Sequence, residues 1–336
     1  MVTARPAAAL AEFPRQASGQ DAAPTKAPPG DALACTVIVC VYTERRWDDI
    51  TAGVLALARQ TRPAAQVLIV VDHNPSLLRR ARVAFSGAAD VDVIANVHGK
   101  GLSGARNTGV EAATGEVLAF LDDDAEPDDT WLERLLEPYR DADIIGVGGA
   151  AVPRWEDGRP RWLPPELDWV IGCSYRGLPE RAAEVRNPIG ANMSFRRAAF
   201  AAGGFTEGLG RVGTLPLGCE ETEFSIRAVA SHPGSRVMYA PDSVVHHHVT
   251  PDRTTWRYLV RRCYAEGQSK AVVARLVGAG PALASERTYL RSTLPRALSR
   301  DIVCAGGRLR VAAVVAAVLG AGLGYLRQRA RGSSAP

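Results

Sequence analysis

Short apolar runs alternate with amphipathic stretches along the first part of the chain. Residues 35–42 (CTVIVCVY) form a continuous run rich in β-branched side chains, which is the pattern of a strand buried on both faces. Residues 47–60 follow with apolar side chains at helical spacing. The same alternation continues downstream and predicts strands at 66–71, 91–97 and 116–121 and helices at 77–85 and 102–113. Such alternation is typical of a parallel, doubly wound sheet.

The regular alternation fades after residue 121. The pattern beyond it predicts a helix at 128–139, a Gly-rich strand at 144–152, a long functional loop at 153–178, a helix at 220–230, short strands at 237–239 and 243–247, and a basic helix at 254–277. Residues 1–33 are rich in Ala and Pro and lack the apolar segment of a signal peptide, so we expect a disordered leader.

Polar residues stand directly after the predicted strands, where ligands bind in doubly wound sheets. Residues 42–44 follow the first strand, residues 72–74 the second and residues 99–107 the third. The third segment combines glycines, a helix start and the cations Lys100 and Arg106, which predicts a diphosphate cradle. It matches neither the P-loop nor the GxGxxG pattern, which weighs against an NTPase or a dehydrogenase.

Three consecutive aspartates, Asp122, Asp123 and Asp124, follow the fourth strand. Adjacent carboxylates repel one another, and at the end of an apolar strand a bound cation relieves that repulsion. Mg²⁺ and Mn²⁺ prefer carboxylate oxygens and also bind substrate phosphates. The structural alternative is a solvated turn whose aspartates cap the next helix.

Seven segments, in this order, carry a family resemblance: VIVCVYTE (37–44), VVDHN (70–74), GLSGARNTGV (101–110), LAFLDDDAEP (118–127), GANMSFRR (190–197), GCEETEFSIR (218–227) and VVHHHV (244–249). With them the chain resembles the glycosyltransferase family 2 enzymes, which are inverting transferases. The resemblance spans about residues 35–250. It implies an α/β, GT-A (Rossmann-like) fold with a mostly parallel sheet flanked by helices, to which this chain adds a helical C-terminal extension.

The resemblance implies a donor site at the strand ends. Thr43, Glu44 and Asp72 would contact the nucleoside of a nucleotide-sugar donor, and Arg106 would lie near the diphosphate or shape that pocket. Asp122 and Asp124 would be the DxD pair that addresses the ribose and the metal-bridged diphosphate, and we count Asp123 with the donor residues. The implied metal ligands are Asp124, Asp122 and His247, and the implied cofactor is Mn²⁺ or Mg²⁺.

The resemblance also implies a catalytic base and acceptor contacts. Glu220-Glu221 stands where the family usually has Glu-Asp, with the second acid as the base. Either carboxylate can accept the acceptor proton, and both are also favoured at a helix N-terminus; by spacing we favour Glu221 over Glu220. Asn192, with Trp155 or Trp162, is a candidate for contacts to the sugar or the acceptor.

Charge divides the chain unevenly. Residues 253–331 hold fourteen Arg and one Lys against three acidic residues, a net charge of +12 within a total of +4. The uncharged run 311–326 is shorter than the roughly 20 residues of a membrane span, so a buried or surface-lying helix and a span with snorkelling arginines both stay open. We expect a cytoplasmic protein whose basic helix at 254–277 is a solvated face or meets anionic phospholipid or a polyprenyl phosphate.

These observations together predict a glycosyltransferase domain at 34–250, with a nucleotide-binding half at 34–125 and an acceptor half at 126–250. A basic helical extension at 251–300 and an apolar helix with its tail at 301–336 follow. The expected partners are a nucleotide-sugar donor, a glycan, lipid-linked or peptide-derived acceptor and an anionic membrane surface, and not nucleic acid. The alternatives are a nucleotidyltransferase and a non-catalytic sugar-nucleotide-binding protein.

Overall fold

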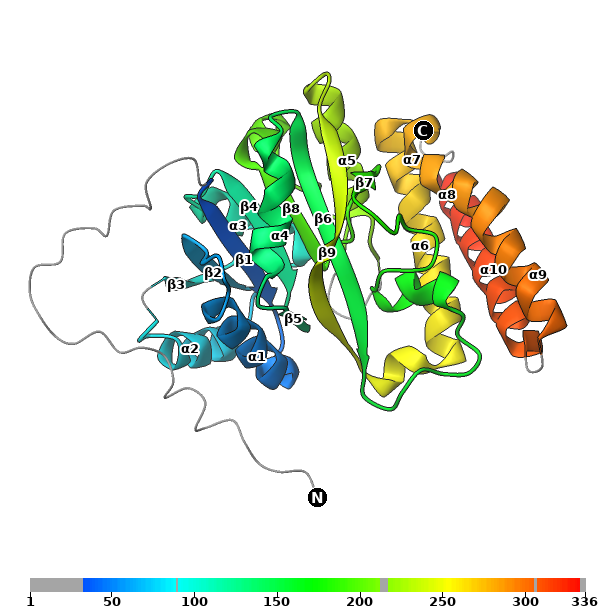
Figure 1. Ribbon diagram of the computed structural model, residues 1–336, viewed down its shortest axis with the longest axis horizontal. Helices are drawn as coiled ribbons and strands as arrows, with labels where there is room; N and C mark the ends of the chain where they lie inside the picture. Colours follow the sequence, from blue (N-terminus) through cyan, green and yellow to red (C-terminus); the bar gives the residue numbers. More distant parts are fainter. Residues whose placement is uncertain (1–32, 89, 212–216, 305–306, 333–336) are drawn as a thin grey trace, which may run out of the picture.

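A computed structural model describes residues 33–88, 90–211, 217–304 and 307–332 (Figure 1). The predicted leader at 1–33 lies outside these ranges except for Leu33. In the described part a nine-stranded sheet has the order β3-β2-β1-β4-β8-β6-β9-β5, and β7 pairs with β9. The strands of its first half are parallel, as predicted: β1 (Cys35–Val41), β2 (Gln66–Val71), β3 (Val91–Ala95) and β4 (Val117–Asp122).

The second half of the sheet is mixed. Its strands are β5 (Ala125–Pro127), β6 (Ile144–Trp155), β7 (Ala183–Glu184), β8 (Asn192–Arg196) and β9 (Arg236–Val249). β8 runs antiparallel between β4 and β6, whereas β9 is parallel to β6 and antiparallel to β5. The prediction of two short strands near 237–247 is wrong, because one long strand absorbs residues 241–243 in a bulge opposite Gly149 and Ala150.

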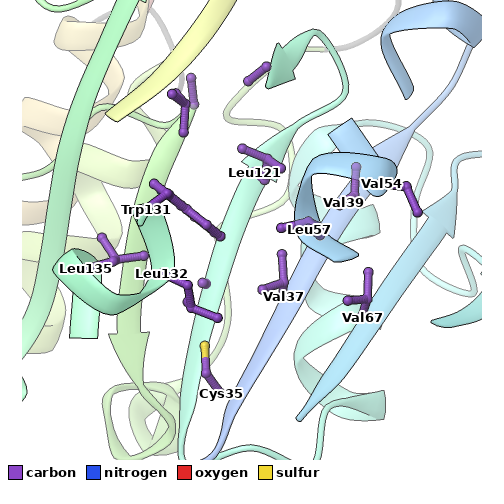
Figure 2. Packing of buried hydrophobic residues seen from close by; sticks show 14 of the residues in the cluster. Cys35, Val37, Val39, Val54, Leu57, Val67, Leu121, Trp131, Leu132 and Leu135 are labelled. Carbon is purple, nitrogen blue, oxygen red and sulfur yellow. The ribbon is translucent and has the colours of Figure 1, made fainter. Parts of the chain in front are cut away.

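Helices cover both faces of the sheet because alternate strand residues point to opposite sides. Val37 and Val39 face α1 (Trp47–Ala58), α2 (Pro75–Ala84) and α4 (Trp131–Leu136), as Figure 2 shows for α1 and α4. Ile38 and Phe120 face α3 (Leu102–Ala112) and α5 (Glu220–Ser231). The sheet is therefore buried on both faces, and only its strand ends are left for a site.

Short 3-10 helices connect these elements. They are η2 (Glu44–Arg46), η3 (Glu137–Arg140), η4 (Pro165–Ile171), η5 (Arg197–Ala202) and η6 (Pro251–Thr254). η4 lies within the segment 153–178 that the sequence predicts as a loop, and β6 takes the first residues of that segment.

A helical layer follows the sheet at the right of Figure 1. It contains α6 (Trp256–Val277), α7 (Ala279–Ala282), α8 (Ala284–Thr288), the π-helical turn η7 (Tyr289–Thr293), α9 (Leu294–Val303) and α10 (Gly307–Gly332). α10 packs along α6 and beside α9. Glycines permit the close approach of α10 to α6, because a Cβ on Gly267 would overlap the carbonyl oxygen of Ala321.

α10 is also the one helix in the described part of the chain that is long and apolar enough to cross a membrane. Only 22% of its most apolar window is buried in the protein. The helix is therefore neither the core helix of a soluble domain nor a segment free of protein contacts.

Candidate active site

The three aspartates of the sequence motif lie at the end of β4, at the edge of the sheet where the site is formed. Asp122 is the last residue of the strand, and Asp123 and Asp124 form the turn into β5. Arg46, which follows β1, pairs with Asp123 and lies 3.0 Å from Oδ2 of Asp124. Arg253 donates from Nη2 to the same Oδ2 at 2.9 Å. Two arginines thus neutralise the buried carboxylates.

Asp122, Asp124 and His247 offer ligand atoms that all lie within 4.8 Å of one another. His247 lies on β9 opposite Ala125, and its Nε2 is 3.2 Å from Oδ1 of Asp124. Its Nδ1 lies 3.7 Å from the Cys173 Sγ, which leaves Nε2 for the carboxylates. The structure thus brings together the three residues that the sequence singled out for a metal.

Strand alternation separates His247 from its two neighbours. His246 and His248 point to the other face of β9, where they pair with Asp128 at 2.8 Å and with Asp49 at 2.9 Å. Gly172 leaves room for the His247 side chain, because a Cβ at this position would lie 3.2 Å from the imidazole. Its φ of 86° lies in the left-handed region, which also favours glycine.

The two buried aspartates differ in proton affinity. Burial opposes the ionisation of Asp124, but His247, Arg253 and Arg46 outweigh it and hold the pKa of Asp124 well below its usual range. Burial raises the pKa of Asp123 to about 7 against the opposing charge of Arg46. Asp123 Oδ2 has no hydrogen-bond partner within the described ranges. Asp124 is therefore the carboxylate that stays charged.

Asp72 lies at the end of β2 and organises the loop that precedes α3. Its Oδ1 accepts a hydrogen bond from Asn96 at 2.7 Å, and its Oδ2 accepts the backbone N–H of Gly101 at 3.0 Å. Gly101 has a φ of 130°, which favours glycine at this turn. The aspartate lines the cavity of the site, so it is placed both to shape the loop and to meet a ligand.

Arg106 joins the aspartates to the glutamates of α5. The side chain is 2% exposed and donates from Nη1 to Glu220 at 2.6 Å and from Nη2 to the Gly190 carbonyl at 3.1 Å. Nη2 also lies 3.6 Å from Asp122. One guanidinium thus holds the strand end and the helix start in a fixed relation.

Glu220 and Glu221 begin α5 but face different surroundings. Glu220 is buried against Arg106, whereas Glu221 is half-buried on the cavity wall. Burial, followed by the charge of Glu220, raises the pKa of Glu221 to about 7, while Lys270 opposes the rise. Both glutamates line the cavity, but Glu220 is held by Arg106, whereas Glu221 combines its place on the wall with a raised pKa.

The other predicted donor residues lie at the rim of the site. Thr43 caps η2 by accepting the backbone N–H of Arg45 at 3.4 Å, and Glu44 is exposed beside it. Lys100 is exposed on the loop before α3 and does not belong to the wall of the main cavity. The structure therefore brings Asp72, Arg106 and the aspartates together and leaves these three residues at the edge.

The structure does not bring the predicted acceptor residues into the cavity. Asn192 is 0% exposed; its Oδ1 accepts Trp131 Nε1 at 2.8 Å, and its Nδ2 donates to the carbonyls of Ala150 and Ser243. Trp155 packs against the Arg159 guanidinium and is not on the cavity wall. Asn192 thus ties β8 to its neighbours, in place of the acceptor contact predicted from the sequence.

Sequence reasoning missed the cations that meet these acids. Arg253 and Lys270 are buried and paired with acids, so the interpretation of residues 254–277 and Arg253 as a solvated basic face is wrong for them. Lys270 Nζ lies 2.8 Å from Glu286 and 3.6 Å from Glu266. The signal available in the sequence was the surplus of Arg and Lys in residues 253–331, which follows a part of the chain with more acidic than basic residues.

One large cavity of about 1560 Å³ is bordered by many of these groups, namely Asp72, Arg106, Asp122, Asp123, Glu220, Glu221 and Lys270. Asp72, Asp122 and Arg106 lie on its sheet side, and Glu221 lies at the start of α5. Residues of the segment 166–191 and of α6, α8, η7, α9 and α10 form most of the remaining wall. The cavity therefore places Asp122 of the candidate metal cluster, the Glu221 carboxylate and an open volume next to one another.

Comparison with known proteins agrees with this geometry. Residues 36–204 match the family model described as Glycosyl transferase family 2. The glucosyl-dolichyl phosphate glucuronosyltransferase of Haloferax volcanii is 35% identical over 243 residues, which cover 72% of this chain and 77% of that protein. The succinoglycan biosynthesis protein ExoM of Rhizobium meliloti is 29% identical over 247 residues, which cover 72% and 75%.

A solved structure shares the fold. It is a mannosyltransferase from Pyrobaculum calidifontis in complex with GDP-Man and Mn²⁺, with a TM-score of 0.55, 21% identity, and coverage of 97% of this chain and 84% of that chain. The mixed sheet flanked by helices confirms the GT-A fold, and the family match confirms the resemblance seen in the sequence. The chain belongs to glycosyl transferase family 2 and is a glycosyltransferase.

Proposed function

We propose that the protein is a metal-dependent, inverting glycosyltransferase that moves a sugar from a nucleotide-sugar donor to a hydroxyl group of an acceptor. The observation that supports this most strongly is the shared cavity. Asp122 and Glu221 both line it, and Arg106 lies between the carboxylates of Asp122 and Glu220. A donor held at the strand ends and an acceptor held at Glu221 would meet inside this volume.

Mn²⁺ or Mg²⁺ fits the donor side of the site. The ligand set of two carboxylates and one imidazole is suited to Mn²⁺, and carboxylates alone suit Mg²⁺. Asp122, Asp124 and His247 would hold the ion. When bound, such an ion supplies Lewis-acid stabilisation of a leaving diphosphate. Asp72 and Arg106 would orient the donor at the same strand ends.

Glu221 would act as the catalytic base. Inversion requires a group that accepts the proton of the acceptor hydroxyl while its oxygen attacks the anomeric carbon and the bond from that carbon to the diphosphate breaks. A carboxylate with a pKa of about 7 is a stronger base than an ordinary glutamate, and about half of it is ionised at neutral pH. Glu220, bound to Arg106, would hold the site together instead.

The acceptor we propose is lipid-linked, and the location is the cytoplasmic face of an anionic membrane. One relative is named for action on glucosyl-dolichyl phosphate. Apolar side chains of α10, including Leu319 and Leu323, are more than 60% exposed, and α9 exposes Ile302 and Val303. Exposed apolar helix faces that are flanked by Arg suit the interface of a membrane.

A donor screen tests the proposal. The full chain is incubated with UDP-, GDP- and dTDP-sugars, with and without Mn²⁺, and its melting temperature is recorded. The expected result is stabilisation by one donor class only when Mn²⁺ is present, since a ligand that binds the folded state raises its stability.

Two variants make this screen specific. Asp124→Asn should abolish the joint effect of donor and Mn²⁺, whereas Asp242→Asn, at an exposed position of β9, should respond like the wild type. Stabilisation that survives in Asp124→Asn would contradict the proposed metal site. Transfer of a nucleotide in place of a sugar would favour the nucleotidyltransferase alternative.

A further inference from the structure

The cavity is larger than a donor and a sugar acceptor need. Its volume of about 1560 Å³ exceeds the roughly 300–1,000 Å³ of ordinary ligand pockets. Its wall continues past Glu221 along α8, η7, α9 and α10, beyond every residue of the proposed chemistry. We call this continuation the C-terminal arm and define it by the wall residues from Leu283 to Leu326.

Aliphatic side chains dominate the C-terminal arm on its α10 side. Its wall residues on α10 are spaced as one helix face: Ala317, Val318, Ala321, Gly322, Tyr325 and Leu326. Val318 is 40% exposed and Leu326 is 64% exposed, so this face keeps apolar surface that the protein itself does not cover. The close contact of Gly267 with Ala321 holds α10 against α6 beside this face.

The wall of the C-terminal arm beyond α10 is apolar as well. It includes Leu290 of η7 and Leu294 and Ala297 of α9. Leu290 is 50% exposed, whereas Leu294 and Ala297 are buried. The exposed apolar surface of Leu290, Val318 and Leu326 favours an extended hydrocarbon ligand, whose burial contributes about 0.8 kcal/mol for each CH₂ group.

Cations stand beside these apolar walls. Arg287, Arg296 and Arg300 line the arm, and Glu286 is the acidic residue among its wall residues. Glu286 is neutralised by Arg186 at 2.5 Å and by Lys270 at 2.8 Å. Arg300 pairs with Glu166 at 2.8 Å, whereas Arg296 is exposed. The arm therefore combines apolar surface with a positive charge balance, which is complementary to a phosphate on an alkyl chain.

We propose that the C-terminal arm binds the isoprenoid chain of a polyprenyl-phosphate-linked acceptor, with the phosphate near the arginines and the sugar toward Glu221. This rests on the proposed function, because it assigns a place to the carrier of the acceptor. The arm borders the exposed residues Leu319 and Leu323 of α10, so a chain can pass from a bilayer into it along a continuous apolar surface.

Binding of model lipids to the full chain tests the arm separately from glycosyl transfer. The probes are farnesyl phosphate, dimethylallyl phosphate as the same head group on a short chain, and inorganic phosphate, each titrated calorimetrically below its micelle concentration. Farnesyl phosphate should bind at least about tenfold more tightly than dimethylallyl phosphate, because the longer chain buries more apolar area. Equal affinity for the two lipids would overturn the proposal, and equal affinity for inorganic phosphate would identify a simple anion site.

A matched pair of variants locates the chain. Gly322 lines the arm, and a Cβ at this position meets no atom within 4 Å, so Gly322→Trp adds an indole at the wall of the arm. Val83→Trp adds the same side chain at an exposed position of α2, which does not line the arm. Gly322→Trp should weaken farnesyl phosphate binding by at least about tenfold, and Val83→Trp by less than about twofold. Equal affinities in both variants would overturn the assignment.

Two further measurements keep the result interpretable. Leu326→Glu, at an exposed position of the arm, should weaken farnesyl phosphate binding even if Gly322→Trp does not fold. Stabilisation by nucleoside diphosphate with Mn²⁺ should be the same in all of these variants. Loss of that response in the wild type would refute the proposed function, whereas intact nucleotide binding without any chain-length preference would refute only the lipid site.

Discussion

At the scale of single residues, the site depends on charges that are placed by distant parts of the chain. The motif of three aspartates could be predicted from the sequence, because it depends on local order, whereas the choice of His247 comes from the family resemblance. The arginines that pair with Asp124 could not be predicted, since Arg46 and Arg253 are separated from it by long stretches of chain. Only the sheet topology brings them together.

The pH dependence of turnover should report on Glu221. Its pKa is raised to about 7 by burial and by Glu220, and a base acts only when it is deprotonated. The rate should therefore rise with pH up to about 7 and then level off. A steady-state pH profile checks this, and a flat profile between pH 5 and 8 would contradict Glu221 as the base.

Lys270 should shift this profile. Of the charged groups that act on Glu221, Glu220 and Glu266 raise its pKa, and Lys270 lowers it. Lys270→Met should therefore move the rising limb of the profile to higher pH. A loss of stability alone would lower the rate at every pH without moving the limb, so an unmoved limb would exclude this positioning role.

Asn192 should contribute to stability and not to acceptor affinity. Asn192→Ala leaves the Trp131 indole N–H and the carbonyls of Ala150 and Ser243 unpaired, and each unpaired buried group costs about 1–3 kcal/mol. Chemical denaturation should show a loss of about 3 kcal/mol or more. Ser235→Ala, which removes a buried hydroxyl without a partner among the described residues, should change stability little.

At the scale of secondary-structure elements, the parallel half of the sheet could be predicted and β8 could not. β1, β2 and β4 are largely apolar runs, whereas β8 buries Asn192 and Ser194. Ser194 lies 2.9 Å from Tyr139 and donates to the Val147 carbonyl at 3.0 Å. The alternating polar and apolar residues of β8 (NMSFR) are typical of a strand with one exposed face, whereas here both faces are buried and tertiary contacts satisfy the polar side chains.

The packing of α10 on α6 should depend on one glycine more than on its neighbour. A Cβ on Gly324 would overlap the carbonyl oxygen of Tyr264, whereas a Cβ on Gly322 meets nothing within 4 Å. Gly324→Leu should therefore loosen α10, and Gly322→Ala should stabilise the helix by up to about 1 kcal/mol. Hydrogen exchange of α10 checks this pair, and equal protection in both variants would contradict the packing.

At the scale of the whole molecule, the surplus of positive charge in residues 253–331 is divided between buried ion pairs and the exposed surface. Arg253 and Lys270 belong to this surplus of +12 but are buried, where Arg253 pairs with Asp124 and Lys270 with Glu286. The remaining arginines include exposed residues at both ends of the apolar helix α10, such as Arg308 and Arg329. The sequence indicates the excess of charge, but only the fold separates its buried part from its exposed part.

The exposed arginines at the ends of α10, together with its exposed apolar side chains, should direct the protein to anionic membranes. Vesicles that contain phosphatidylglycerol should bind the full chain, neutral vesicles should bind it more weakly, and salt should reduce the difference. A double variant, Leu319→Asp with Leu323→Asp, should weaken binding by at least about tenfold, because it places charges on the exposed apolar face. Binding that ignores both lipid charge and this variant would contradict the membrane proposal.

The release of nucleoside diphosphate from the donor, measured with Mn²⁺ in wild type and in Glu221→Gln, tests the central claim most directly. We expect the rate to fall by about 10²–10⁴ in Glu221→Gln while donor-induced stabilisation is unchanged, since general bases contribute about this factor. Glu137→Gln, on the surface of η3, should retain the wild-type rate. An undiminished rate in Glu221→Gln would contradict base-assisted transfer from this cavity.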